Sequence, residues 1–465
     1  MTTFVLNDKI IQTHQPQGMT LLDFVRYHKH LIGTKIGCRE GDCGACNLLM
    51  GELIDGKVYY KSLTSCITPL GNAQGKHIVS IEGLNMDELT PYQQAMVDES
   101  GSQCGICTVG FIVSFAGECL AYRPNSYESV IGAIDGNICR CTGYKSIERA
   151  ANIVYNKLKN KDVENPVAWL VKHKFIPEYF LNIPKKISQI ATPAPENGHV
   201  IVGGGTDLFV QKHDEIYESS VNLISDNKHL TGIRIESGKC IIGAATNATQ
   251  MLESKVLNDI FPNLYTHLKL VSSTPIRNIG TVAGNFINAS PIGDLTAFFI
   301  ALNSTIHLKN KSGNTRFLLL KDLYKGYKIL DKTEDEYITH FSFEIPDSDT
   351  YFNFEKVSKR TYLDIASVNT AMRITVQNDY IKAVHISAGG VAPIPKYLQQ
   401  TCEYLTGKHL TENTILEALE VMQNEVAPIS DARGAKEYKR LLLRQLVFAH
   451  FMELFPEKFE LAMVG

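Results

Sequence analysis

The chain has 465 residues, of which 44% are hydrophobic and 20% charged, which suits a globular protein of about two to four domains. Its formal net charge of −3 argues against a nucleic-acid surface as the main function. No stretch reaches the roughly 18 apolar residues of a spanning helix, and Met1 to Asp8 lacks a signal-peptide pattern. We therefore expect a cytoplasmic protein without a membrane span, whose clustered cysteines bind metal rather than form disulfides.

The first 83 residues predict a small mixed α/β domain with a metal-binding loop. Alternating apolar residues predict hairpins over 1–13 and 48–63, the second turning at Asp55-Gly56. The Gly- and Cys-rich stretch 33–46 has no regular period and is predicted to be a loop.

The pattern changes to helices over residues 84–160. Thr90 is a suitable cap, and Pro91 suits the first helical position. Further helices are predicted over 105–122, 126–135 and 144–157, with the later cysteines at their starts or joints.

A polar and proline-rich stretch, 161–182, predicts a linker, and prolines continue at Pro184, Pro193 and Pro195. Residues 183–347 then alternate β-like runs with Gly and Asn turns. Residues 350–461 open with strands and end in helices.

Eight of the eleven cysteines form two groups, and the first has the plant-type 2Fe-2S spacing. Three thiolates on one short loop can converge on a small cluster, while glycines let the backbone fold around it and direct amides at the sulfurs. Zinc is the alternative, but four-cysteine zinc sites usually combine two C-x2-C pairs, and this group has one short pair. We expect an iron–sulfur cluster held by Cys38, Cys43, Cys46 and Cys66.

The second group, Cys104-x2-Cys107-x31-Cys139-x1-Cys141, could by spacing hold either zinc or a second cluster. No βαβ pattern surrounds its C-x2-C pair, which argues against a thioredoxin-like motif. Its place directly after a ferredoxin-like loop favours a second 2Fe-2S cluster, so that two metal centres would form an electron-transfer path. The other cysteines, Cys119, Cys240 and Cys402, are expected to be buried hydrophobic side chains.

Two later stretches are candidate nucleotide-binding segments. Residues 201–208 predict a strand running into a triple-glycine turn, whose amides could face a phosphate, although the pattern also fits a plain tight turn. Leu208 stands where a Rossmann fingerprint has glycine or alanine, and no Walker A motif is present. The second stretch, 277–294, is crowded with small and amide residues, which is typical of a ligand-contacting loop.

Together these motifs resemble the molybdenum hydroxylase family. Residues 103–108 and 139–144 are similar to the family's second 2Fe-2S motif, and 37–46 to its plant-type cluster. The two glycine-containing stretches resemble its FAD-binding domain, and the similarity continues through 356–366 and 389–393. Val109 and Ser146 replace a proline of many members, but neither is a ligand position.

The resemblance implies a multidomain α+β fold. Its parts would be a plant-ferredoxin-like β-grasp domain (1–83), a four-helix 2Fe-2S domain (84–160), the linker (161–182), a vanillyl-alcohol-oxidase-type FAD-binding α+β domain (183–347) and a C-terminal α+β flavoprotein domain (350–461).

The resemblance also implies cofactor-binding residues. The FAD pyrophosphate and ribityl chain would lie at Val202, Gly203, Gly204, Gly205, Thr206, Asp207 and Leu208. The rest of the flavin nucleotide would be lined by Thr281, Gly284, Asn285, Ser290 and Asp294. Lys356 is the candidate lysine near the flavin ring, and Gln103 the candidate glutamine that hydrogen-bonds the pterin.

Three side chains leave alternatives open. Arg277 and Lys356 could be surface charges instead of ligand contacts. Tyr362 stands where several members carry an acidic residue beside the nicotinamide site. An anion there would help set the flavin potential and the choice of acceptor, so this departure leaves open whether NAD is the acceptor.

The function implied is electron transfer through two 2Fe-2S clusters and FAD to NAD, with no catalytic residue on this chain. Because no molybdenum-binding region follows the flavin domain, we expect the small subunit of a bacterial enzyme of the xanthine dehydrogenase type. A large molybdopterin-binding partner, in a dimer of heterodimers, would oxidise hypoxanthine and xanthine to urate in purine catabolism. A family member acting on an aldehyde or an N-heterocycle is one alternative, and a non-catalytic iron–sulfur redox sensor is another.

Overall fold

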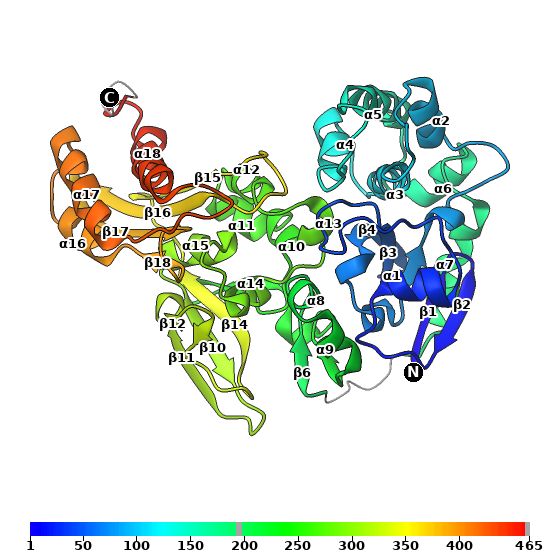
Figure 1. The fold of residues 1–465 in the computed structure, drawn as a ribbon, viewed down its shortest axis with the longest axis horizontal. Coiled ribbons are helices and arrows are strands. Elements are labelled where there is room, and N and C mark those ends of the chain that lie inside the picture. The colour runs from blue at the N-terminus through cyan, green and yellow to red at the C-terminus, as the bar shows by residue number, and fades with distance from the viewer. Residues whose placement is uncertain (192–197, 461–465) are drawn as a thin grey trace. The chain divides into compact units, whose positions relative to one another are not determined.

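The computed structural model describes residues 1–191 and 198–460. These residues divide into two compact units, Met1–Asp226 with Ser273–Gly280, and Asn227–Ser272 with the chain from Thr281 onward (Figure 1). Pro193, Pro195 and the predicted boundary at residue 461 lie outside the described residues. Within the described ranges, no helix is long and apolar enough to cross a membrane.

The first unit begins with a mixed sheet of strand order β2-β1-β5-β3-β4. β1 runs parallel to β5, and the remaining neighbours are antiparallel. The predicted turn at Asp55-Gly56 is confirmed, with both residues at positive φ as a tight two-residue hairpin turn requires. The strands are β1 (Thr2–Leu6), β2 (Lys9–Thr13), β3 (Asn47–Ile54), β4 (Lys57–Thr64) and β5 (His77–Val79).

A short helix, α1 (Leu21–Asp23), follows β2 and continues as a π-helix over Phe24–His28. Helices follow as predicted: α2 (Pro91–Asp98), α3 (Thr108–Cys119), α4 (Tyr127–Ala133) and α5 (Lys145–Leu158). Thr90 and Gln93 cap α2 reciprocally, which confirms the predicted helix start.

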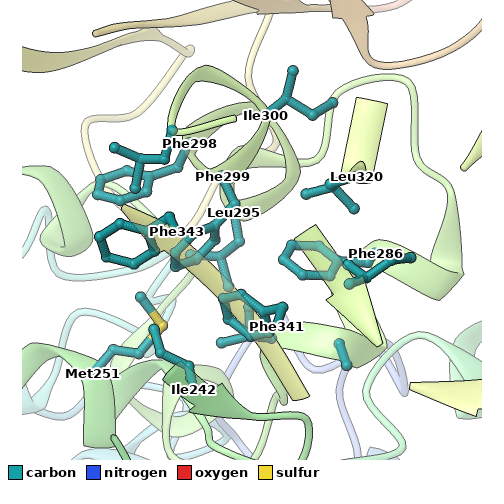
Figure 2. Packing of buried hydrophobic residues seen from close by; sticks show 14 of the residues in the cluster. Ile242, Met251, Phe286, Leu295, Phe298, Phe299, Ile300, Leu320, Phe341 and Phe343 are labelled. Carbon is teal, nitrogen blue, oxygen red and sulfur yellow. The ribbon is translucent and has the colours of Figure 1, made fainter. Parts of the chain in front are cut away.

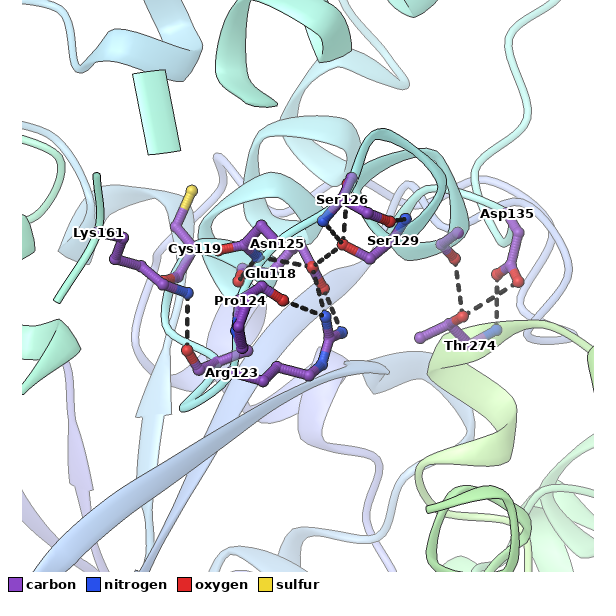
Figure 3. Close-up of polar contacts among 12 residues, drawn as sticks. Glu118, Cys119, Arg123, Pro124, Asn125, Ser126, Ser129, Asp135, Lys161 and Thr274 are labelled. Atoms are coloured by element: carbon purple, nitrogen blue, oxygen red, sulfur yellow. Dashed lines mark hydrogen bonds and ion pairs between the residues drawn. The ribbon is translucent and has the colours of Figure 1, made fainter. Parts of the chain in front are cut away.

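The buried Glu118 carboxylate, near the end of α3, ties this helix to α4. It accepts hydrogen bonds from Arg123, Asn125 and Ser129, at distances between 2.6 and 3.0 Å (Figure 3). Lys161 donates to the carbonyl of Cys119 at 3.2 Å and so satisfies the carboxyl end of α3.

The stretch 161–182, expected to be a linker, is folded and packed. It contains α6 (Pro166–Lys172) and a 3-10 turn over Glu178–Asn182. Leu170, Phe175 and Phe180 are buried in the same apolar cluster as α3 and α5. Their burial shows that this stretch packs on the helical domain, although its prolines and polar residues predict a linker.

The rest of the first unit contains a short parallel pair, β6 (Val200–Val202) with β7 (Val221–Leu223). Its helices are α7 (Ile183–Ser188), α8 (Leu208–Gln211), α9 (His213–Glu218) and α13 (Thr274–Arg277). Val202, Phe209 and Ile279 share an apolar cluster with Cys46 and Cys66 of the first sheet region.

The second unit contains two larger sheets. The first has strand order β11-β10-β14-β9-β8, and its core is dominated by phenylalanines, among them Phe286, Phe298, Phe299, Phe341 and Phe343 (Figure 2). Its strands are β8 (Ile233–Glu236), β9 (Lys239–Gly243), β10 (Thr305–Lys309), β11 (Thr315–Leu319) and β14 (Tyr337–Glu344), with the small pair β12 (Tyr324–Gly326) and β13 (Ile329–Leu330). The helices beside it are α10 (Ala248–Leu252), α11 (Lys255–Ile260), α12 (Leu264–Lys269), α14 (Val282–Asn288) and α15 (Asp294–Ala301).

The other sheet has strand order β15-β16-β17-β18. Its strands are β15 (Thr350–Val357), β16 (Val368–Gln377), β17 (Tyr380–Gly389) and β18 (Lys396–Tyr397), followed by α16 (Gln399–Leu405), α17 (Glu412–Glu425) and α18 (Lys436–Leu454). α18 packs on β15 and β16, and α15 packs on β16 and β17 (Figure 1). The predicted order of strands followed by helices is therefore observed.

Candidate functional site

The first cysteine group is assembled at the open end of the β3–β4 hairpin. Cys46 directly precedes β3, and Cys66 follows β4 in a 3-10 turn. The Ser65 hydroxyl donates to the Cys46 carbonyl at 2.7 Å, which holds these two cysteines side by side. Both are buried, whereas Cys38 and Cys43 on the preceding loop are half-buried.

Hydrogen bonds in this group favour a thiolate at Cys38. Contacts from the Cys43 and Cys66 thiols, in that order, hold the pKa of Cys38 well below its usual value. The Glu40 and Cys43 amides also donate to its sulfur, at 3.3 and 3.4 Å. Since iron binds the thiolate and not the thiol, this loop is prepared for a metal ligand.

Three glycines of this loop meet backbone or steric demands that favour glycine. Gly41 and Gly44 have φ of +81° and +67°, in the left-handed region. A Cβ on Gly37 would lie 2.5 Å from the Cys43 sulfur. These glycines therefore allow the backbone to fold closely around its own sulfur atoms.

The second group lies at the start of α3 and in the loop between α4 and α5. Cys107 and Cys139 are buried, and Cys104 and Cys141 are exposed. Burial and a hydrogen bond to Cys139 raise the pKa of Cys107 to about 12, and a hydrogen bond to Cys104 raises the pKa of Cys141. The thiols are thus paired as Cys107 with Cys139 and Cys104 with Cys141.

Thr142 prepares Cys139 as a ligand. Its hydroxyl and amide donate to the Cys139 sulfur at 3.1 and 3.4 Å. Burial raises the pKa of Cys139, but these hydrogen bonds outweigh burial and the pKa is lowered overall. Gln103, the predicted pterin contact, is exposed beside Cys104.

The two cysteine groups are joined by hydrogen bonds within the first unit. The amide of Ile138, next to Cys139, donates to the Cys43 carbonyl at 3.0 Å. The buried Asn137 side chain donates to the Gly44 carbonyl at 3.2 Å. One backbone hydrogen bond therefore connects a ligand-bearing loop of each group.

The donor chemistry of both groups fits the predicted clusters. Each supplies four cysteines, and backbone amides point at the sulfurs of Cys38 and Cys139. In the part of the chain that the structure describes, no three His, Cys, Asp or Glu side chains are placed to hold a metal ion. A 2Fe-2S cluster differs from such a site because it spreads its thiolates over two iron atoms. The buried Cys119, Cys240 and Cys402 lie outside both groups, as predicted.

The triple-glycine turn lies at the carboxyl end of β6, where parallel strands commonly present ligand-binding loops. Gly205 has a φ of +83°, and a Cβ on Gly204 would lie 1.9 Å from the Ile279 carbonyl oxygen. Close packing is thus one reason for these glycines, and Thr206 and Asp207 lead from the turn into α8.

Arg277 is a buried residue at the end of α13 and not a surface charge. Its guanidinium lies 2.6 Å from the Asp135 carboxylate, and both side chains are 3% exposed. The interpretation of Arg277 as a surface charge is therefore wrong, and its partner could not be identified from local pattern because Asp135 is distant in the sequence.

The predicted flavin residues of the second unit lie along α14, in the loop that follows it and at the start of α15. Thr281 caps α14 by accepting from the Gly284 amide at 3.2 Å. The Asn285 side chain accepts from the Thr296 amide and hydroxyl, at 3.1 and 2.9 Å, and so joins the two helices. Ser290 lies in the loop between them.

Lys356 is a buried cation, which excludes the alternative of a solvated basic edge. Its Nζ donates to Asp294 Oδ2 and to the Leu270 carbonyl, each at 2.7 Å. Its side chain is 1% exposed and that of Asp294 11%. The second oxygen of Asp294 accepts from Asn369 at 2.6 Å.

Asn369 was not identified from sequence. It lies opposite Lys356 in the antiparallel register of β15 and β16. Only that register could have shown that both side chains reach Asp294. Tyr362, by contrast, is 42% exposed, and the Lys269 ammonium lies over its ring at 5.4 Å.

Four family models match the chain in succession. They are the 2Fe-2S iron-sulfur cluster binding domain (residues 4–71), the [2Fe-2S] binding domain (80–152), the FAD binding domain in molybdopterin dehydrogenase (179–348) and the CO dehydrogenase flavoprotein C-terminal domain (353–454). Together with the sheets and helices above, they confirm the predicted multidomain α+β fold.

Curated relatives match nearly the whole chain. A xanthine dehydrogenase of Blastobotrys adeninivorans is 26% identical over 99% of this chain and 41% of its own length. Aldehyde oxidase 4 of Rattus norvegicus is 24% identical over 98% of this chain and 40% of its own length. The chain thus spans about two fifths of the length of these relatives.

Solved structures show a likeness in fold. The carbon monoxide dehydrogenases of Hydrogenophaga pseudoflava and Oligotropha carboxidovorans are 23% and 24% identical, each covering 53% of this chain and 86% of the matched chain, with a TM-score of 0.50. The four family models thus give the chain two 2Fe-2S binding domains, an FAD-binding domain of the molybdopterin dehydrogenase type and a flavoprotein C-terminal domain, and the xanthine dehydrogenases and aldehyde oxidases above are similar to nearly all of it.

Proposed function

We propose that the chain transfers electrons in a xanthine dehydrogenase, between a molybdopterin-binding partner and NAD. The observation that carries this proposal is the pair of four-cysteine groups in one compact unit, joined by the Ile138–Cys43 hydrogen bond. The xanthine dehydrogenase relatives support the substrate class, since they align with nearly the whole chain.

The proposed ligands are Cys38, Cys43, Cys46 and Cys66 for one 2Fe-2S cluster, and Cys104, Cys107, Cys139 and Cys141 for the other. When bound, the clusters would carry single electrons, and FAD would collect them in pairs for delivery to NAD. The chain's own amides, at Glu40 and Thr142, stabilise negative charge on the ligand sulfurs.

For FAD we propose two contributions. Residues 202–208 would supply backbone amides at the carboxyl end of β6, as such loops do for phosphate. Thr281, Gly284, Asn285 and Ser290 would line the nucleotide. Lys356, which is neutralised by Asp294, would present a buried and oriented ammonium rather than a free positive charge.

The exposed Cys104, Cys141 and Gln103 form the proposed approach for the molybdopterin partner, in a dimer of heterodimers. The proposed domains are 1–83, 84–160, 183–347 and a last domain from 350, with 161–182 packed on the helical domain.

The decisive experiment compares Cys104→Ser with Cys240→Ala in the complex with the molybdopterin partner. Cys240 is fully buried and lies outside both groups, so it controls for the loss of a thiol. We expect Cys104→Ser to keep FAD but to lose xanthine-driven flavin reduction, while the control keeps both. Unaltered xanthine-driven reduction in Cys104→Ser would refute the proposed route.

The aldehyde oxidase relatives support a second candidate, the same role with an aldehyde or N-heterocycle substrate. Assays of the complex with xanthine, hypoxanthine and an aldehyde would separate the two. NAD is tested on the chain itself, because NADH should bleach its flavin. Absence of bleaching would reject NAD and point to a different acceptor near Tyr362.

A further inference from the structure

Residues 273–280 lie within the match to the FAD-binding domain but pack in the unit that carries both cysteine groups. This segment contains α13 and continues to Gly280. Its side chains contact both cluster domains, 1–83 and 84–160, and these contacts include a buried ion pair.

The contacts with the second cluster domain are charged and buried. The Arg277 guanidinium donates to Asp135 at 2.6 Å and to the Thr274 hydroxyl at 2.7 Å. Thr274 donates from its amide to Asp135 at 2.7 Å and from its hydroxyl to the Gly132 carbonyl at 2.8 Å (Figure 3). Asp135 is four residues before Cys139, so these hydrogen bonds fix the segment that leads to the second cysteine group.

The contact with the first cluster domain lies on the next residue of the segment. The Asn278 side chain donates to the Ser62 carbonyl of β4 at 2.7 Å, four residues before Cys66. Ile276 and Ile279 pack with the apolar cluster that contains Cys46 and Cys66. One short segment thus contacts, in each domain, the residues that lead to a cysteine ligand.

The two cluster domains also pack on each other directly, because Leu49 and Val79 of the first share an apolar cluster with α3 of the second. Asn137 donates to the Gly44 carbonyl at 3.2 Å and accepts from Ser114, which in turn accepts from Asn47. Residues 273–280 add a second attachment, which bonds each domain four residues before one of its cysteine ligands.

We propose that residues 273–280 brace the two cluster domains against each other and thereby set the orientation and separation of the two clusters. Arg277, Asp135 and Asn278 are then positioning residues for electron transfer between the clusters. A buried ion pair suits this role, because loss of one partner leaves an uncompensated charge and so opposes separation of the segment from the domain. The inference rests on the proposed function, since it requires both clusters.

The test measures the magnetic interaction between the two reduced clusters by electron paramagnetic resonance on the full chain. Arg277→Met removes the charged contact, and Asn278→Ala removes the contact on the opposite side of the brace. Glu88→Gln is the control, because it breaks an exposed ion pair with Lys174 elsewhere in the same unit. Iron and sulfide content is measured in each variant.

We expect both brace variants to keep two cluster signals and to change the splitting between them. Electron exchange between the clusters should slow roughly tenfold or more, because small displacements of redox or reacting groups have large rate effects. The Glu88→Gln variant should match the wild type in both measurements.

Splitting and exchange rates equal to the wild type, with both clusters loaded, would overturn the brace. If Arg277→Met fails to fold, Asn278→Ala decides alone, and an unchanged splitting in that variant overturns the proposal. A wild-type chain with fewer than two cluster signals would instead refute the proposed function itself.

Discussion

Lys356 and Lys359 are three residues apart but lie in opposite environments. Lys356 is buried against Asp294, whereas Lys359 is exposed and donates to the Ala432 carbonyl at 3.1 Å. Lys356→Met should lower the free energy of unfolding of the second unit by about 3 kcal/mol, because it leaves the Asp294 charge uncompensated. Lys359→Met should cost less than about 0.5 kcal/mol.

Urea unfolding of the full chain, followed by circular dichroism, measures both effects, and flavin retention is measured in parallel. Equal shifts for the two lysines would show that the Asp294 pair contributes nothing to the fold. Asn369 donates to the same carboxylate, so Asn369→Ala should also lower the free energy of unfolding.

Cys66 and Cys119 are both buried, yet only Cys66 lies in a four-cysteine group. Cys66→Ala should remove the spectroscopic signal and the iron of one cluster and leave the other cluster intact. Cys119→Ala, the matched control, should retain both clusters. Iron content together with visible and paramagnetic resonance spectra measures this, and retention of both signals in Cys66→Ala would contradict the ligand assignment.

At the scale of elements, two glycines with the same φ allow backbone strain to be separated from steric contact in the cysteine loops. Gly44 and Gly143 both have a φ of +67°, but a Cβ on Gly44 would lie 2.4 Å from Asn137, whereas nothing lies within 4 Å of one on Gly143. Gly143→Ala should therefore cost only the left-handed strain of about 1 kcal/mol. Gly44→Ala should in addition break the contact between the two cluster domains.

Thermal unfolding and iron content distinguish these outcomes. We expect Gly143→Ala to load both clusters with a small loss of stability, and Gly44→Ala to lose iron from the first cluster. If both variants behave alike, backbone strain alone explains the glycines and the contact with Asn137 has no role.

Elements with local causes could be predicted from the sequence. The Asp55-Gly56 turn and the Thr90 cap are decided within a few residues, and both are observed where expected. The grouping of Cys38, Cys43 and Cys46 on one loop could also be predicted, because it depends only on their spacing in the sequence.

Elements that depend on distant partners could not be predicted. The stretch 161–182 reads as a linker, but Leu170 and Phe175 find a core built by other helices. The buried ion pair of Arg277 could not be predicted, because its partner Asp135 lies 142 residues away in the sequence. Asn369 reaches Asp294 only through the strand register opposite Lys356.

At the scale of the whole molecule, each unit contains a buried neutral histidine. Burial lowers the pKa of His77 in the first unit and of His450 in the second unit to about 3. His77 contacts the Tyr60 hydroxyl and the Asn7 carbonyl, at 2.8 and 2.9 Å, and its pKa is also lowered by Lys186 and raised by Asp8. His450 is held by Thr370 and Asn353, at 2.6 and 3.1 Å.

These histidines predict acid sensitivity in both units. The unfolded chain binds a proton at each histidine below about pH 6.5, while the folded chain does so only near pH 3. The stabilisation is therefore complete above about pH 6.5 and is lost as the pH falls from there toward 3, by up to about 1.4 kcal/mol per pH unit for each histidine. His77→Gln should flatten this dependence for the first unit and His450→Gln for the second, whereas the exposed His14→Gln should not. Urea unfolding between about pH 7 and pH 4.5 measures the slopes, and equal slopes for His77→Gln, His450→Gln and His14→Gln would show that the buried histidines do not control the acid response.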